Sequence, residues 1–244
     1  MKSVVSTRGL EVRFDDAIVL NGVDLELPAG SSLAVIGPNG SGKSTLLGVL
    51  AGTIQPSGGT SSVDGPPPAF VLQSTDVDPS LPITVLDTVA MARYPSLGLL
   101  RRFRQQDHDA VAAALERLDV ADLAARQLHE LSGGQRQRVL VAQGLAQESN
   151  VLLLDEPITG LDLTSQTVIL EVIDEQVAAG RVVIVTTHEL DDARRCDQVL
   201  LLNTRAIAVG SPAEVLTEVH LREAFGRGFI RVGDKLILDD PHHH

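Results

Sequence analysis

The stretch SLAVIGPNGSGKSTLLGVL, residues 32–50, joins three patterns that together predict the core of the fold. SLAVI is short, apolar and rich in branched residues, which indicates a buried strand. GPNGSGKST fits G-x-x-x-x-G-K-[ST], and LLGVL continues it as a helical run. In a glycine-rich loop that opens a helix, backbone N–H groups can converge on phosphate oxygens, and the helix dipole favours negative charge. The stretch therefore predicts an α/β fold built around a nucleoside triphosphate site.

The residues of this loop have distinct expected tasks. Lys43 is expected to reach the β- and γ-phosphates, and Ser44 to offer its hydroxyl to Mg²⁺. The alternative is a glycine-rich turn with an exposed lysine, but loop, lysine, hydroxyl and flanking elements all agree with phosphate binding. The residues predicted to bind nucleotide here are Gly37, Asn39, Gly40, Ser41, Gly42, Lys43, Ser44 and Thr45.

Other apolar runs predict the remaining strands. SLAVIG, VLLLD, RVVIVTT and QVLLLN are short and nearly uninterrupted, as in strands covered on both faces, so we expect a mostly parallel sheet. Apolar residues alternate with polar ones at Leu10, Val12 and Phe14 and again over 23–27, which predicts an antiparallel β flank. FIRVGDKLIL, residues 229–238, predicts a hairpin.

The pattern changes to a helical one after Ser74. HDAVAAALERLDVADLAAR, residues 108–126, has helical spacing, and DVDPSLP is typical of a loop. We predict one α/β domain, a P-loop NTPase core formed by residues 1–73 and 150–238. An α-helical subdomain, residues 74–149, is inserted into it. Residues 239–244 form a tail, interpreted as a tag remnant because it ends in HHH.

Composition limits the classes of function. The 244 residues are 43% apolar, enough to bury a sizeable core. A net charge of −12 disfavours broad binding to nucleic acid or anionic lipid. The single cysteine, Cys196, excludes an intrachain disulfide, and no apolar run reaches about 18 residues, so no membrane span is expected. The basic run RRFR, residues 101–104, is either a solvated loop or subunit-docking surface, or a contact to phosphate or a lipid headgroup.

VLLLDEP, residues 151–157, ends a predicted strand with two acids. Asp155 stands at the carboxyl end of that strand, where open α/β sheets bind ligands, and can orient Mg²⁺ through water. Glu156 can polarise a water for in-line attack on the γ-phosphate, which simple binding does not require. The alternative for Glu156 is an acid at a helix start. Hydrolysis is favoured over binding alone.

Taken together, these motifs resemble those of the ATP-binding cassette (ABC) ATPase family, in the family's order and across nearly the whole chain. GPNGSGKST resembles the Walker A loop, Gln73 in FVLQS the Q-loop, and LSGGQ, residues 131–135, the signature. VLLLDEP resembles the Walker B strand, and His188 in VTTHEL the switch histidine. TGLD, residues 159–162, resembles the D-loop, although many members have Ser-Ala before Leu-Asp. The resemblance implies an ATPase that uses ATP and Mg²⁺.

The resemblance also implies a homodimer, or a paired ABC subunit, that holds two ATP molecules between its chains. Each site would combine the phosphate loop of one chain with the signature of the other. Ser132 and the N–H groups of Gly133 and Gly134, at a helix start, would contact the γ-phosphate, and Gln135 the ribose or the interface. An ordinary serine cap would explain Ser132 but not the Gly-Gly-Gln that follows.

Further roles follow from the same resemblance. Gln73 would touch Mg²⁺ or the attacking water, and His188 would contact the γ-phosphate and hold Glu156 or the water. Taken alone, each would pass for an ordinary residue at the end of a strand. Asp162 would cross the dimer interface and is also suited to cap a helix. Phe14 would stack on adenine, where the family often has Tyr; the alternative is a core Phe in a strand.

One copy of each motif without a membrane span is typical of the ATPase subunit of a multi-subunit transporter. Residues 78–95 and 201–226 resemble the manganese/zinc-type metal importer branch. This implies import of a divalent metal ion, an integral membrane permease, an extracytoplasmic substrate-binding protein and a position at the cytoplasmic face of the cell membrane, without nucleic acid. Two alternatives are a soluble ABC ATPase of iron–sulfur cluster assembly and an ATPase acting on nucleic acid or ribosomes.

Overall fold

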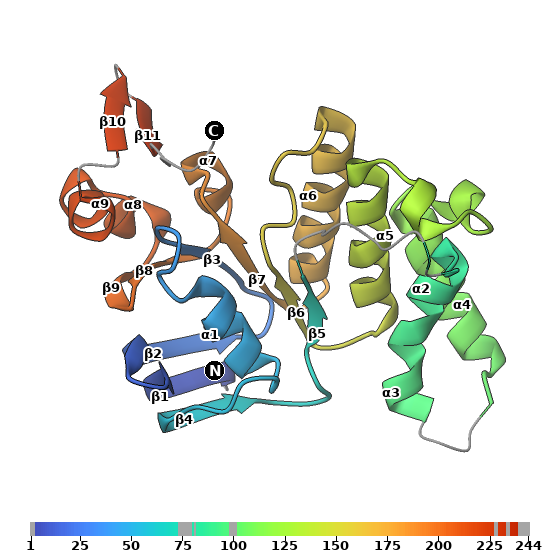
Figure 1. Cartoon of the computed structure of the whole chain (residues 1–244), viewed down its shortest axis with the longest axis horizontal. Helices are drawn as coiled ribbons and strands as arrows, with labels where there is room; N and C mark the ends of the chain where they lie inside the picture. The colour runs from blue at the N-terminus through green and yellow to red at the C-terminus, as the bar shows by residue number, and fades with distance from the viewer. Residues whose placement is uncertain are drawn as a thin grey trace.

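A computed structural model of the chain describes residues 3–72, 80, 82–97, 102–226, 229–232 and 235–238, with only the backbone at 96, 97, 229–232 and 235–238. Within these residues, the centre is a six-stranded sheet with the order β5-β6-β7-β3-β8-β9 (Figure 1). Its strands are β3 (Ser32–Ile36), β5 (Ala69–Val71), β6 (Val151–Leu154), β7 (Val182–Thr187), β8 (Gln198–Asn203) and β9 (Arg205–Gly210). Every pairing is parallel except that of β8 with β9, so the predicted mostly parallel sheet is confirmed.

The continuous apolar runs form strands because this sheet is covered on both faces. Every residue of β3, β6 and β7 is buried. Successive side chains of β3 belong to two different hydrophobic clusters, with Leu33 and Val35 in one and Ala34 and Ile36 in the other. A strand between two cores has no solvent-facing positions, which is why its sequence does not alternate.

An antiparallel sheet and one helix cover the first face. The sheet has the order β2-β1-β4, and the helix α1 lies between it and the central sheet (Figure 1). These elements are β1 (Ser3–Phe14), β2 (Ala17–Pro28), β4 (Gly58–Val63) and α1 (Lys43–Leu50). Leu10 and Val12 of β1 share a cluster with Leu46 and Leu47 of α1. The predicted antiparallel flank is confirmed.

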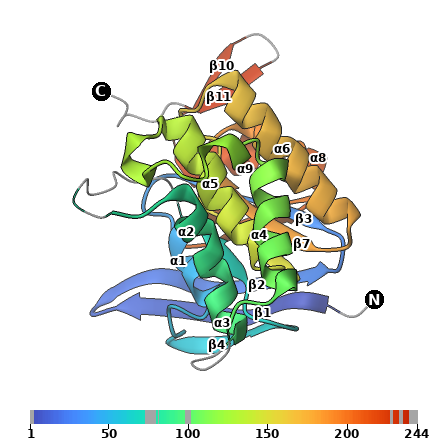
Figure 2. The same cartoon turned by 90° about the vertical axis from the view of Figure 1, so that its right-hand side faces the viewer.

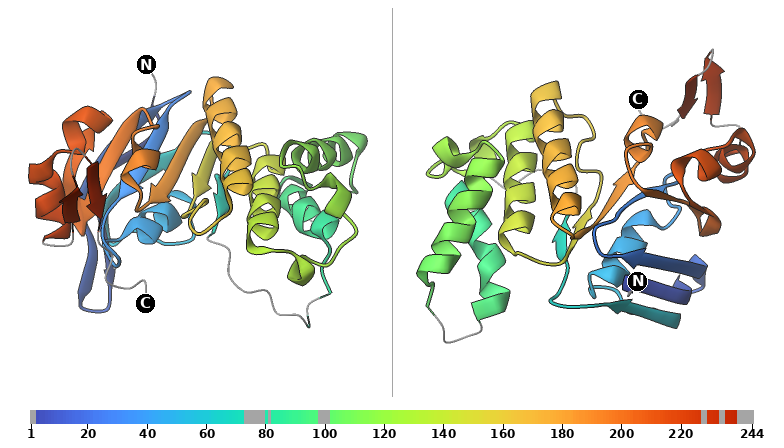
Figure 3. Two further views of the ribbon diagram at one scale, coloured as in Figure 1. Left: turned by 90° about the horizontal axis from the view of Figure 1, so that it is seen from above. Right: turned by 180° about the vertical axis from the view of Figure 1, so that it is seen from behind.

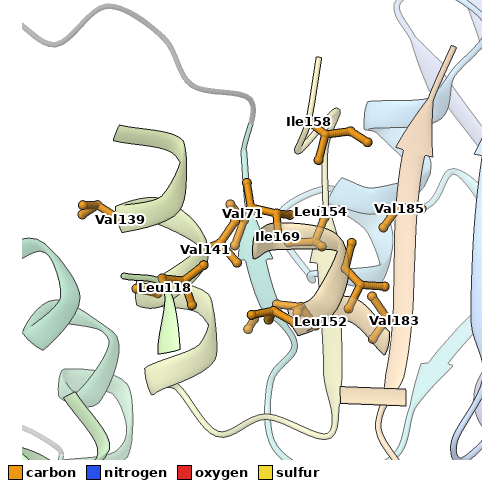
Figure 4. Packing of buried hydrophobic residues seen from close by; sticks show 14 of the residues in the cluster. Val71, Leu118, Val139, Val141, Leu152, Leu154, Ile158, Ile169, Val183 and Val185 are labelled. Atoms are coloured by element: carbon orange, nitrogen blue, oxygen red, sulfur yellow. The ribbon is translucent and has the colours of Figure 1, made fainter. Parts of the chain in front are cut away.

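Two long helices, α5 (Gly133–Ala146) and α6 (Leu163–Ala178), cover the second face. Figure 4 shows Val141 of α5 and Ile169 of α6 beside Leu152 and Leu154 of β6. The two helices also contact each other. The first residues of both helices are therefore held relative to the ends of the strands.

Between β5 and β6 the chain leaves the sheet and forms further helices. These are α2 (Val85–Ala90), α3 (Tyr94–Leu97), α4 (Gln105–Arg117) and short 3₁₀ helices at Met91–Arg93, Ala121–Leu123 and Leu128–Glu130. Figure 2 shows α2 and α4 against α5, and Figure 3 shows these helices at the opposite end of the molecule from the C-terminal helices. The subdomain boundaries at residues 73/74 and 149/150 stay a prediction.

The helical spacing over 108–126 does not form one helix, because α4 ends at Arg117. Asp119 has φ of +53°, a left-handed conformation that interrupts an α-helix. Nη1 of Arg138, on α5, donates to the carbonyl oxygens of Leu118 at 3.0 Å and Asp119 at 2.7 Å. A side chain from a neighbouring helix thus satisfies carbonyls that another turn of α4 would have used.

The described part of the basic run 101–104 leads into α4. Phe103 packs edge-on against Tyr94, with ring centroids 5.5 Å apart. The backbone N–H of Arg104 donates to Oδ2 of Asp107 at 2.9 Å, which closes the start of the helix. Arg101 lies outside the described residues, as does most of the predicted loop 76–82.

The C-terminal part contains α7 (Leu190–Ala193), α8 (Pro212–Val215), α9 (Glu218–Phe225), β10 (Phe229–Val232) and β11 (Lys235–Leu238). Of these, α8 and α9 pack against β8 and β9, while α7 contacts β3 and β7. The last two strands pair antiparallel, with Phe229 opposite Leu238, so the predicted hairpin is confirmed. In the described ranges, no helix combines the length and the apolar character that crossing a membrane would require.

Because the central sheet is buried on both faces, truncating a side chain in its middle should strongly lower the free energy of unfolding. Leu153→Ala removes a fully buried side chain of β6 and should lower the free energy of unfolding by about 2–5 kcal/mol. Leu163→Ala, at a residue with 81% exposure, should change it by less than about 0.5 kcal/mol. Urea denaturation of both variants measures the difference, and equal effects would contradict the two-core arrangement.

Candidate active site

The phosphate loop wraps around Lys43. The loop follows β3 and ends at Gly42, which has φ of +102° and stands at the N-terminus of α1. Nζ of Lys43 donates to the carbonyl oxygens of Gly37 at 2.7 Å and Pro38 at 3.2 Å, and the side chain is buried. The loop therefore presents a positive charge beside the first backbone N–H groups of a helix, which have no intrahelical acceptor.

Close packing limits which residues this loop can contain. A Cβ on Gly37 would lie 2.0 Å from the carbonyl oxygen of Leu202, and one on Gly42 would lie 2.6 Å from Cδ2 of Leu20. Among the described residues, Oγ of Ser41 is buried and has no hydrogen-bond partner. Ser44, next to Lys43, is exposed. A tight loop with an unsatisfied hydroxyl and an exposed serine at a helix start fits a bound phosphate chain with its Mg²⁺.

Asp155 and Glu156 follow β6, at the edge where β3 and β7 also end. In the sheet, Leu154 is opposite Val185 and Ile36 is opposite Thr187, so the carboxyl ends of the three strands are adjacent. Asp155 is almost fully buried, with 9% exposure. The arrangement brings an acid suited to orient a metal to the same sheet edge as the phosphate loop.

Glu156 lies close to His188. Its Oε2 is 3.7 Å from Nδ1 of the imidazole, and both side chains are partly buried. Contact with His188 holds the pKa of the Glu156 carboxyl below its usual range, and the positive charge of Lys43 acts in the same direction, against the opposing effect of burial. The carboxyl is thus ionised at neutral pH and able to accept a hydrogen bond from a water.

The signature residues open α5. Ser132 is the N-cap: its Oγ accepts from the N–H of Gln135 at 3.2 Å, and Oε1 of Gln135 accepts from the N–H of Ser132 at 3.1 Å. The serine cap that the sequence left as an alternative is therefore present, and Gln135 completes it. Ser132 and Gly133 are nevertheless exposed, so the cap leaves this helix start open to a ligand.

The two glycines of the signature have different surroundings. A Cβ on Gly134 would lie 2.5 Å from Oδ2 of Asp162 and from Oγ of Ser165, so close packing within the chain requires glycine there. A Cβ on Gly133 would meet no atom within 4 Å among the described residues. Packing among the described residues therefore explains Gly134 but not Gly133.

Asp162 caps α6. Its Oδ1 accepts from the N–H of Ser165 at 2.9 Å, and Oδ2 accepts from the Ser165 hydroxyl at 2.9 Å. The Ser165 N–H and hydroxyl hold the pKa of the Asp162 carboxyl below its usual range. The cap that the sequence allowed is thus formed, and it packs against the signature through Gly134.

Two predicted site residues stand apart from these groups. Phe14 ends β1 and has 49% exposure, while Leu10 and Val12 are buried, so the alternative of a core Phe is wrong. Its ring is accessible for stacking, which stays a prediction. Gln73 lies outside the described residues.

One contact residue was missed in the sequence. Thr186, in β7, donates to Oδ1 of Asp155 at 2.6 Å, and its Oγ1 accepts from the N–H of Glu156 at 2.8 Å. The only signal was a pair of threonines at the end of the apolar run RVVIVTT, directly before His188. Thr186 therefore contacts both acids that follow β6.

Comparison with known proteins gives consistent results. Residues 20–159 match the family described as "ABC transporter". "Manganese transport system ATP-binding protein MntB" of Listeria innocua is 33% identical, over 91% of this chain and 96% of that protein. "Chelated iron transport system membrane protein YfeB" of Yersinia pestis is 37% identical, over 82% of this chain and 71% of that protein.

A solved structure agrees with the fold. A chain of an ABC transporter in an inward-facing conformation superimposes with a TM-score of 0.84, at 28% identity, over 98% of this chain and 96% of that one. The agreement covers the α/β core, the β flank and the inserted helices. Together with the phosphate loop and the two acids, the matches identify the chain as a member of the ABC transporter family, among its ATP-binding domains that hydrolyse ATP.

Proposed function

We propose that this chain is the ATP-hydrolysing subunit of a divalent metal importer, and that it works as a head-to-tail dimer around two Mg²⁺-bound ATP molecules. The observation that supports this best is the convergence of Lys43, Asp155, Glu156 and His188 at the carboxyl ends of three adjacent parallel strands. A protein that only binds ATP would need the phosphate loop and its lysine, but not the acid and imidazole. The acid–imidazole pair beside them is suited to activating a water.

In this proposal the phosphate loop binds and the acids act on the water. Lys43 and the N–H groups of residues 37–45 hold the β- and γ-phosphates, with Asn39 and Thr45 at the edge of the loop. Ser44, Gln73 and Asp155 hold Mg²⁺, which supplies positive charge to the phosphoryl oxygens when bound. Phe14 stacks on the adenine ring.

Glu156 orients the attacking water and accepts its proton. Its lowered pKa keeps the carboxylate ionised, so it is available as an acceptor at neutral pH. His188, 3.7 Å away, keeps the carboxylate in place and contacts the γ-phosphate. Gln73 completes the set of residues around the water.

The position of the signature supports the proposed dimer. Ser132 and Gly133 form an exposed helix start with a favourable dipole. The next residue, Gly134, packs beside Asp162, and α5 covers the second face of the sheet, whereas α1 lies on the first. A second copy, turned head to tail, brings this helix start to the γ-phosphate. No described residue lies within 4 Å of the place that a Cβ on Gly133 would take, which leaves space for that ligand. Asp162 approaches the partner's site along the same interface.

The transported substrate is inferred from relatives. The Listeria relative is named for manganese and the Yersinia relative for chelated iron, so a transition-metal ion is the class we propose. The membrane permease is a separate chain, with an extracytoplasmic substrate-binding protein on the other side. The subunit then works at the cytoplasmic face of the membrane.

Two substitutions separate binding from hydrolysis. Lys43→Ala should abolish tight ATP binding, because it removes the charge that holds the phosphates. Glu156→Gln should keep binding and trap a dimer while lowering hydrolysis by at least about 100-fold. Arg8→Ala and Glu26→Gln, at an exposed ion pair, are the matched controls and should behave as the native chain. Calorimetry with ATP and a phosphate-release assay measure both; normal hydrolysis by Glu156→Gln would disprove its role.

Mixing two variants tests whether ATP is shared between chains. Neither Ser132→Arg nor Lys43→Ala should form ATP-dependent dimers alone, because each lacks one half of every site. Their mixture should form only heterodimers, each with one of its two sites intact, giving at most about half of the native number of sites at equal amounts. Light scattering with ATP measures this, with exposed Ser62→Arg as the control. Failure of the mixture to form dimers would contradict ATP sharing.

Transport can be tested on the assembled system. Affinity capture from native membranes should recover an integral membrane protein, and proteoliposomes containing both should move Mn²⁺, Zn²⁺ or Fe²⁺ with ATP. Glu156→Gln in the same assembly should lose the flux and keep the complex. A soluble scaffold as the captured partner, or flux independent of ATP, would overturn the proposal.

A further inference from the structure

One buried hydroxyl connects the two acids of the proposed site. Thr186 has no exposed surface and lies on β7, next to β6 in the sheet. Its Oγ1 is 2.6 Å from Oδ1 of Asp155 and 2.8 Å from the backbone nitrogen of Glu156. A hydroxyl has one donor and two acceptor positions, so it can donate to the carboxylate and accept from the N–H simultaneously.

We propose that Thr186 is a positioning residue for hydrolysis, because its single hydroxyl fixes both the metal-side carboxylate of Asp155 and the backbone that carries Glu156. The inference rests on the proposed function, in which Asp155 holds Mg²⁺ and Glu156 orients the water. Thr186 itself touches neither the nucleotide nor the water. Its effect on the reaction passes through the two acids.

The bond to Asp155 sets the direction of a carboxylate. Thr186 donates to Oδ1, and the backbone N–H of Asp155 donates to the carbonyl oxygen of Val71 on β5, so both the side chain and the backbone of Asp155 are anchored. With Oδ1 engaged, the carboxylate cannot rotate freely, and Oδ2 keeps a constant direction. Partners of this kind orient metal ligands, and their loss weakens metal binding even though they never touch the metal.

The hydrogen bond between Thr186 and the N–H of Glu156 holds a backbone conformation that is rare for a non-glycine residue. Glu156 has φ of +46°, a left-handed conformation that non-glycine residues rarely adopt. Such conformations persist only where surrounding contacts maintain them. The N–H of Glu156 donates to Thr186, at the point where the chain turns from β6 toward the imidazole of His188. Without this bond the backbone can relax and carry the carboxylate away from His188.

A purely structural role would look different. Thr7 on β1 is also buried, with 1% exposure, and its Oγ1 donates to the carbonyl oxygen of Val23 at 2.9 Å. Removing that hydroxyl should cost stability without altering hydrolysis. Thr7→Val is therefore the matched control for Thr186→Val, since both replace a buried strand hydroxyl with a methyl group.

The experiment compares Thr186→Val, Thr186→Ser and Thr7→Val in the full chain. Thr186→Val should lower kcat by about 10–100-fold with little change in KM for ATP, and Thr186→Ser should restore most of it. In the hydrolysis-deficient Glu156→Gln background, Thr186→Val should also raise the Mg²⁺ concentration that half-saturates ATP binding by about 10-fold or more. Thr7→Val should change neither quantity. Thermal melting monitors folding of each variant.

The outcomes separate this inference from the proposed function. If the native chain hydrolyses ATP and Glu156→Gln does not, but Thr186→Val keeps native kcat and Mg²⁺ dependence, only the role of Thr186 is overturned. If the native chain neither binds nor hydrolyses ATP, both fail. If Thr186→Val does not fold, Thr186→Ala is compared with Thr186→Ser, because the two differ only in the hydroxyl. Equal kcat and Mg²⁺ dependence in that pair would overturn the inference.

Discussion

The parallel pairing of β6, β7 and β3 is the constraint on which the rest of the site depends. Because the three strands run in the same direction with fixed register, their carboxyl ends lie side by side. The acids after β6, the histidine after β7 and the phosphate loop after β3 then meet without any long-range loop. This register is held by two cores, so the precision of the site depends on apolar packing several residues away from the chemistry.

Much of this could be predicted because burial on two faces leaves a clear sequence pattern. The strands could be predicted because they are uninterrupted apolar runs. The phosphate loop could be predicted from its glycines, and at Gly37 only glycine fits, because a Cβ there would meet the carbonyl oxygen of Leu202. The end of α4 could not be predicted, since it depends on a hydrogen bond from Arg138, which lies on another helix. Thr186 was missed for a similar reason, because its two partners lie about thirty residues earlier in the chain.

Capping and ligand binding can coexist at the signature. Oγ of Ser132 accepts from the N–H of Gln135, which uses a lone pair and leaves the hydroxyl hydrogen to donate. An anion needs that hydrogen and the N–H groups of the helix start. Asp162 differs, because Ser165 already donates to both of its carboxylate oxygens. The cap at Ser132 thus keeps a donor available for a ligand, while the two hydrogen bonds from Ser165 fix the orientation of the Asp162 carboxylate.

The two glycines of the signature differ in whether packing among the described residues explains them. Gly134 is explained within the chain, because Asp162 and Ser165 occupy the space of its missing side chain. Among the described residues, no atom lies within 4 Å of the place that a Cβ on Gly133 would take, so packing in this part of the chain does not require glycine there. A missing side chain at the first position of a helix leaves its backbone N–H groups open to a ligand. In the proposed dimer that ligand is the γ-phosphate bound by the second copy, so the exposed start of α5 is only half of a site.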